Sequence, residues 1–155
     1  MAAALHGTRT PCWPPDGRTA LLAIVDTGPL LATANDADPD HAACVDALTQ
    51  RDLDLVIPAL CVAEVCYFLG ERHGSDVEAR FVAGLAGYPV VAPEPEDWSA
   101  IADLVRRYSN LPLGTTDASV VMLAERMDTT RIVTLDRRHF GVVKNRRGQP
   151  FELCP

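Results

Sequence analysis

The sequence lacks a long apolar run of the kind that a membrane helix needs. Within its 155 residues, no such run reaches the roughly 18 to 20 residues that span a bilayer. The longest is interrupted by Pro58 and Glu64. The N-terminus, MAAALHGTRTPCWPP, has no apolar core of signal-peptide length. We therefore expect one soluble domain in the cytoplasm, without membrane association.

The sequence also lacks a set of residues for a disulfide framework or a zinc site. Its five cysteines are an odd number, which does not favour paired cysteines. Cys61 and Cys66 lie five apart on one predicted helix, so they point about 140° away from each other and cannot share a metal. The four histidines are scattered along the chain: His6, His41, His73 and His139. We expect buried, reduced thiols.

Positive charge is scarce except at the C-terminal end. The net charge of −7 argues against a protein whose whole surface binds nucleic acid. Residues 126–155, however, carry seven bases against three acids, whereas residues 1–125 carry seven bases against eighteen acids. The basic end is either a phosphate-contacting surface or a solvated charged tail.

Short apolar runs alternate with helical patterns from residue 21 onward. Residues 1–20 are rich in proline and poor in large apolar residues, so we expect a poorly ordered extension with no role in the core. The predicted strands are 21–26, 55–57, 88–92, 131–135 and a weak 151–153, and the predicted helices are 39–50, 58–74, 76–86, 95–108 and 116–127. This alternation predicts an α/β fold, with helices on both faces of a mainly parallel sheet of about five strands.

Four acids stand at positions that ordinary solvation does not explain. Asp26 ends the apolar run LLAIVD, and Asp136 ends RIVTLD, so both fall at the carboxyl edge of the predicted sheet. Asp117 follows LPLGTT at the start of a helix, and Glu64 is the one charge in IPALCVAEVCYFLG. A lone carboxylate buried there would cost several kcal/mol.

Each acid also has a structural interpretation when taken singly. The three aspartates suit helix caps or turns, and Glu64 suits a buried, hydrogen-bonded acid. Together they suit a metal site, because clustered carboxylates repel unless a cation neutralises them. Hard oxygen ligands favour Mg²⁺ or Mn²⁺, which lower the pKa of bound water and stabilise charge on a phosphodiester under attack.

Four segments, in this order and spacing, resemble the PIN-domain ribonucleases, and more narrowly the VapC toxins of VapBC toxin–antitoxin modules. They are AIVDTGPLLATAN, PALCVAEVCYFL, LPLGTTDASVVMLAE and RIVTLDRRHF. The resemblance covers about residues 21–145 and implies a PIN domain over residues 21–155, built as a three-layer α/β/α sandwich. It also implies an Mg²⁺-dependent endoribonuclease, with Mn²⁺ as a substitute.

The resemblance assigns roles to particular residues and partners. The catalytic, metal-binding acids are Asp26, Glu64, Asp117 and Asp136, with Thr27 and Thr116 orienting carboxylates or water. RNA contacts would come from the basic end: Arg137, Arg138, Lys144, Arg146 and Arg147. Expected partners are an RNA substrate, a VapB-like antitoxin that covers the acidic cleft and forms a heterooligomer, and a second copy in a homodimer. The apolar helix around Glu64 suits burial against both core and partner.

Three other functions stay open, and one position departs from the family pattern. The chain can be a non-catalytic interaction module that keeps the fold but not the chemistry. The chain can be a solitary PIN-domain RNA-processing nuclease. It can also be a phosphatase that uses Asp26 as a nucleophile, although such enzymes want an acid two residues later, where this chain has Gly28. Three residues beyond Asp136, where similar sequences often carry another acid, stands His139.

Overall fold

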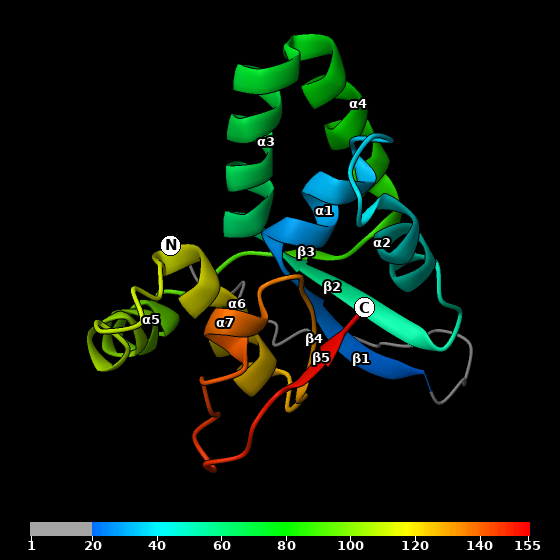
Figure 1. The fold of residues 1–155 in the computed structure, drawn as a ribbon. Helices are drawn as coiled ribbons and strands as arrows, with labels where there is room; N and C mark the ends of the chain where they lie inside the picture. The colour runs from blue at the N-terminus through cyan, green and yellow to red at the C-terminus, as the bar shows by residue number, and fades with distance from the viewer. Residues whose placement is uncertain (1–19) are drawn as a thin grey trace, which may run out of the picture.

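A five-stranded parallel sheet forms the centre of the molecule. The computed structural model describes residues 20–155, so the expected extension lies outside the described residues except for Ala20. The strands lie in the order β3-β2-β1-β4-β5, and all four neighbouring pairs are parallel. The predicted α/β fold with a parallel sheet of five strands is confirmed (Figure 1).

Each predicted strand is present, with shifted ends. The bounds are β1 Leu21–Val25, β2 Leu53–Pro58, β3 Val90–Val91, β4 Arg131–Val133 and β5 Glu152–Cys154. The central strands β1 and β4 end just before their acids, so Asp26 and Asp136 occupy the loops that follow. The backbone N–H of Asp26 still donates to the carbonyl of Val133 at 2.9 Å, which ties that loop to the neighbouring strand.

Among residues 20–155, seven α-helices connect and cover the strands, and two of them are short and were not predicted. The predicted ones are α2 His41–Leu48, α3 Ala59–His73, α4 Ser75–Gly84, α5 Asp97–Arg107 and α6 Thr115–Arg126. The others are α1 Thr27–Thr33 and α7 Arg137–Phe140. Helix α1 was not predicted because it contains Gly28 and Pro29, which disfavour a helix interior. Both lie in its first turn, where the backbone N–H groups have no partner within the helix.

The helices and the sheet form three layers, as expected. On one face of the sheet, Val25 and Ile57 line a space beneath α1, α2 and α4. Successive side chains of a strand point to opposite faces of the sheet. Their neighbours Ile24 and Val56 therefore point toward the other face. There α6 packs against β1, β2 and β4, and α5 covers α6.

The most completely buried helix is α6, which runs through the core from the carboxyl edge of the sheet. All seven residues from Ala118 to Ala124 are buried. An ion pair between Asp97, at the start of α5, and Arg126, at the end of α6, holds these two helices antiparallel. In Figure 1, α3 and α4 extend together away from the sheet as a helical arm. No helix among residues 20–155 combines the length and apolar character needed to cross a bilayer.

Candidate metal and nuclease site

Asp26 is the most deeply buried of the four acids. It is only 5 % exposed, and its Oδ2 accepts a hydrogen bond from the Thr134 hydroxyl at 2.7 Å. The pKa of the Asp26 carboxyl is raised to about 6, mainly by burial and also by the charges of Asp117 and Asp136, while the hydrogen bonds from Thr134 and the Thr27 N–H partly offset this rise. Although Asp26 occupies the N-cap position of α1, its side chain makes no cap hydrogen bond. The helix-cap interpretation therefore fails for Asp26.

Glu64 lies half-buried on α3 and is tied to the residue that follows Asp26. The Thr27 hydroxyl donates to Glu64 Oε2 at 2.6 Å, across 37 positions of sequence. The buried residues of α3 are Cys61, Val65 and Leu69, so Glu64 lies at the edge of the core-facing stripe. Glu64 is thus a hydrogen-bonded acid held beside the carboxyl end of β1.

Asp117 and Asp136 come together around His139. His139 Nδ1 lies 2.7 Å from Asp136 Oδ2 and 3.6 Å from Asp117 Oδ2. Both acids also perform the turn roles that the sequence suggested: Asp136 Oδ1 accepts from the His139 N–H at 2.9 Å, and Asp117 Oδ2 accepts from the Gly114 N–H at 3.3 Å. Asp117 therefore uses the same oxygen, Oδ2, for the backbone and for the approach to His139, whereas Asp136 binds the backbone through Oδ1 and approaches the ring with Oδ2.

Thr134 is the residue that sequence reasoning missed. Its hydroxyl donates to Asp26 and also accepts from the Asp136 N–H at 2.9 Å, so one side chain links two of the acids. Thr134 is 1 % exposed. Its position two residues before Asp136 places it at the end of β4, and that spacing was the available signal. Thr116, the other predicted orienting residue, contributes its backbone carbonyl to Ser119 rather than a side-chain bond to an acid.

The acids also influence one another's ionisation. Burial raises the pKa of Asp117, the nearby charges of Asp136 and Glu64 raise it further, and the Gly114 N–H and His139 oppose this. Within residues 20–155, however, no three His, Cys, Asp or Glu side chains are grouped closely enough to hold a metal ion. Without a cation the carboxylates repel one another, and each is instead held by a protein donor. The structure gathers the acids at one edge without forming a closed coordination shell.

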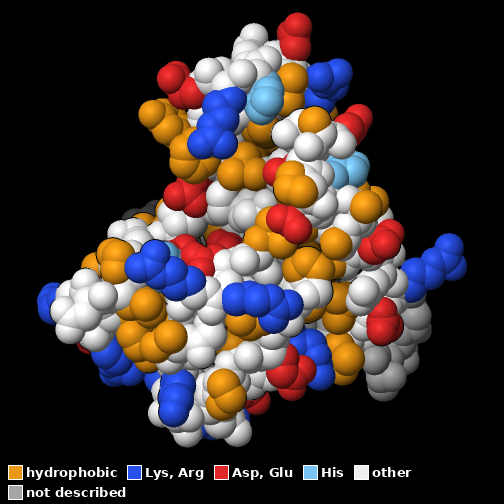
Figure 2. Space-filling view, in the orientation of Figure 1, with side chains coloured by type: hydrophobic (Ala, Val, Ile, Leu, Met, Phe, Trp, Pro, Cys, Tyr) orange, Lys and Arg blue, Asp and Glu red, His pale blue; other side chains and the backbone are white. Residues whose placement is uncertain are grey.

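The predicted RNA-contacting residues divide into two groups. Arg137 and Arg138 are exposed on α7 beside Asp136, and Arg137 donates to the Pro155 carbonyl at 3.1 Å. Lys144 is exposed farther along, with its backbone N–H bonded to the Tyr108 hydroxyl at 3.1 Å. In the space-filling view, acidic side chains lie in a hollow below the α3–α4 arm, with basic side chains beside it (Figure 2).

Arg146 and Arg147 lie at the other end of α6. Arg146 pairs with Glu125 at 2.7 Å, and Arg147 pairs with Asp128 at 3.2 Å. Glu125 stands eight residues after Asp117 on the same helix, about 12 Å along its axis. The structure therefore does not bring these two arginines to the acids.

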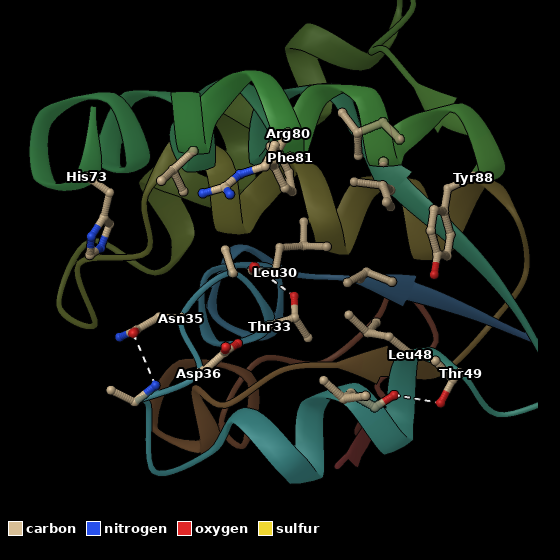
Figure 3. A pocket seen from close by; sticks show the side chains of 18 residues that line it. Leu30, Thr33, Asn35, Asp36, Leu48, Thr49, His73, Arg80, Phe81 and Tyr88 are labelled. Carbon is tan, nitrogen blue, oxygen red and sulfur yellow. Dashed lines mark hydrogen bonds between the residues drawn. The ribbon is translucent and has the colours of Figure 1, made fainter. Parts of the chain in front are cut away.

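A separate pocket of about 770 Å³ lies between α1, α2 and α4 (Figure 3). Its walls are largely apolar and include Leu30, Leu48 and Phe81, with Arg80 and His73 among its polar residues. None of the four acids lines it. The acidic edge and this pocket are distinct features of the molecule.

Comparison with known proteins agrees with the resemblance seen in the sequence. Residues 23–145 match the sequence model of the PIN domain. The chain is 35 % identical over 134 residues to Ribonuclease VapC26 of Mycobacterium tuberculosis, covering 85 % of this chain and 99 % of that protein.

Solved structures share the fold at low sequence identity. The Mycobacterium tuberculosis toxin VapC20, described as cleaving the sarcin–ricin loop, superposes with a TM-score of 0.69 at 15 % identity, covering 78 % of this chain and 96 % of that one. VapBC2 from Rickettsia felis, bound to a DNA fragment from its promoter, gives 0.65 at 12 % identity, covering 87 % and 100 %. A toxin–antitoxin complex from Klebsiella pneumoniae gives 0.60 at 17 % identity, covering 78 % and 92 %.

Proposed function

The chain belongs to the PIN-domain family and is a homologue of the VapC ribonucleases, and from this we propose that it is an Mg²⁺-dependent endoribonuclease toxin restrained by a VapB-like antitoxin. The observation that carries the proposal is the gathering of Asp26, Glu64, Asp117 and Asp136 from four separate segments at the carboxyl edge of the sheet. Mutual repulsion makes that arrangement costly unless it binds a cation.

The donor set fits a hard divalent cation. Four carboxylates supply the oxygen ligands that Mg²⁺ and Mn²⁺ prefer, and the raised pKa of Asp26 records how poorly the protein alone stabilises that charge. When bound, the cation supplies Lewis-acid stabilisation of charge on the phosphodiester and activation of water. The four acids would hold it, while Thr27 and Thr134 fix the orientation of Glu64 and Asp26.

RNA binding is proposed at the rim formed by α7. Arg138 is exposed two residues after Asp136 and has no ion-pair partner among residues 20–155, so its guanidinium is available to a phosphate flanking the scissile bond. Arg137 lies beside it, and Lys144 extends the same basic segment. Arg146 and Arg147 would need to leave their carboxylate partners to reach RNA, so we assign the principal contacts to the first two arginines.

An antitoxin and a second copy are proposed as protein partners. The acidic edge favours a basic or arginine-bearing antitoxin segment, by charge complementarity. The helical arm offers an apolar contact: Tyr67 on α3 is 65 % exposed and packs its ring against Phe68, with centroids 5.5 Å apart. An exposed tyrosine beside a half-buried phenylalanine suits a homodimer or heterooligomer interface.

The alternative phosphatase chemistry has little structural support. Such an enzyme needs a second acid two residues after Asp26, and this chain has Gly28 at that position. The solitary-nuclease alternative shares the same acids and differs only in lacking an antitoxin.

The direct test is cleavage of RNA by purified protein. We expect new 5′ ends when total RNA is incubated with the protein and Mg²⁺ or Mn²⁺, and none with EDTA or with Asp26→Asn. Asp103→Asn is the matched control, because Asp103 is an exposed acid that pairs with Arg106 on α5. RNA left intact in every metal tried would overturn the nuclease proposal, whereas cleavage without any basic protein partner in a pull-down would favour a solitary nuclease.

A further inference from the structure

Within residues 20–155, no segment fills the apolar pocket between α1, α2 and α4. The pocket is lined by the aromatic rings of Phe81 and Tyr88 together with aliphatic side chains such as Leu48. Phe81 is half-buried, and Tyr88 is 37 % exposed. The volume of about 770 Å³ falls within the roughly 300–1,000 Å³ that binding sites occupy. A concave, apolar and aromatic surface of this kind calls for an occupant.

The two ends of the pocket differ in their position on the chain and in charge. One end holds Leu48, Thr49 and Tyr88, and the other holds His73, Asn35 and Asp36 (Figure 3). The backbone N–H of Leu21, at the start of β1, donates to the Asp52 carbonyl at 2.8 Å. Asp52 follows Thr49 by three residues, so the chain enters β1 within about 11 Å of the first end. The other end is acidic, because the Asp36 side chain is 99 % exposed.

The segment that precedes β1 carries the sequence TPCWPP at residues 10–15. This is a P-x-x-P pattern, from Pro11 to Pro14, with Trp13 inside it and a further proline after it. Proline fixes φ near −65° and has no N–H donor, so such a segment favours the extended polyproline II conformation. Segments of this kind bind aromatic-lined grooves at a low cost in conformational entropy.

We propose that residues 10–15 of this chain dock in the pocket, with the indole of Trp13 against Phe81 and Tyr88. Eight residues separate Trp13 from Leu21, and an extended chain of that length reaches about 26 Å, which is enough to enter the pocket. The short tether makes the contact intramolecular, so a weak interaction suffices to populate it.

Charge favours the same direction of binding. A chain that enters beside Thr49 and continues along the pocket brings Arg9 toward the end that holds the exposed Asp36. Arg9 lies four residues before Trp13, or about 12 Å in the polyproline II conformation. The guanidinium and the carboxylate have opposite charge, which orients the segment in the pocket.

The docking goes beyond the proposed nuclease function and does not depend on it. None of the four acids lines the pocket, so a docked segment leaves RNA cleavage unchanged. The segment removes apolar surface from water, which stabilises the docked state. Any other partner that binds the same apolar surface must first displace it.

Tryptophan fluorescence of the full chain tests the docking. The chain has two tryptophans, so Trp98→Phe leaves Trp13 as the only emitter, and Trp13→Phe leaves Trp98, which is 48 % exposed. We expect Trp13 to emit at shorter wavelength than Trp98 and to be quenched severalfold less by acrylamide. In the Trp98→Phe chain, Phe81→Ser should move the emission and quenching of Trp13 to those of an exposed indole. Val82→Ser is the matched control, because Val82 is 49 % exposed on α4 and does not line the pocket.

Two results would overturn the docking. One is a Trp13 that acrylamide quenches as fully as it quenches Trp98. The other is a protected Trp13 whose fluorescence does not respond to Phe81→Ser, because the indole would then be buried elsewhere. If Phe81→Ser does not fold, Tyr88→Ser replaces it, since the Tyr88 side chain is already partly exposed. RNA left uncut by a protein with a protected Trp13 would overturn the nuclease proposal alone.

Discussion

Replacing Asp26 with Asn should stabilise the metal-free protein while destroying its activity. The pKa of the Asp26 carboxyl rises from its ordinary value of 3.8 to about 6 on folding, so the folded state binds the proton more tightly than the unfolded state. Stability from this group is therefore full below about pH 3.8 and is lost as the pH rises to 6. The difference corresponds to about 3 kcal/mol at neutral pH.

The amide in Asp26→Asn is neutral at every pH and its oxygen can still accept from Thr134. We expect the free energy of unfolding at pH 7.5 in EDTA to rise by about 2 kcal/mol, equivalent to roughly 4–8 °C in melting temperature for a chain of this size. The gain is smaller than 3 kcal/mol because the amide introduces two N–H donors in a buried place.

Urea or thermal unfolding between pH 4 and 8, with EDTA throughout, measures this effect. The advantage of Asp26→Asn should shrink as the pH falls toward 4, whereas Asp46→Asn, on the exposed face of α2, should show no such trend. A variant that is less stable than the wild type at pH 7.5, or a difference that does not vary with pH, would refute the assignment of Asp26 as a buried carboxylate strained by its neighbours.

Three further predictions follow from the contacts around the acids. Glu64→Gln should keep the melting temperature of the metal-free protein within about 2 °C of the wild type, because Thr27 can still donate to the amide oxygen. The same variant should lose RNA cleavage. If it unfolds instead, Glu64 is an acid that the fold itself requires. Thr134→Val should lower the free energy of unfolding by about 1–3 kcal/mol in chemical denaturation, since it removes partners from two buried polar groups, and Thr134→Ser should restore most of it. In a steady-state cleavage assay, Arg138→Ala should raise KM severalfold with less effect on kcat, whereas Arg147→Ala should leave KM unchanged. Equal increases of KM in the two variants would mean that RNA does not bind at the rim formed by α7.

Much of the site was predictable because its acids conflict with their local surroundings. A charge inside an apolar helix, and acids that close buried strands, require a partner, and the parallel topology brings the strand ends to one edge. Thr134 gave a weaker signal, since a hydroxyl at the end of a strand usually needs no function. Its importance lies in two hydrogen bonds that only the folded chain reveals.

The errors and gaps in the prediction arose from tertiary contacts. Helix α1 was not predicted because Gly28 and Pro29 disfavour a helix interior, yet packing and the first-turn position tolerate both. The placement of Arg146 and Arg147 was equally hidden, since the segment after α7 folds back to the far end of α6 and pairs them there. Charge counted along the sequence cannot distinguish the two ends of one helix.

Calorimetric titration of Mn²⁺ and Mg²⁺ tests most directly whether the four acids form one metal site. We expect the wild-type protein to bind at a site that Asp26→Asn, Glu64→Gln, Asp117→Asn and Asp136→Asn each weaken by on the order of tenfold or more. Asp103→Asn should bind as the wild type does. Unchanged binding in the four variants would contradict a shared carboxylate site, and the acids would then be structural.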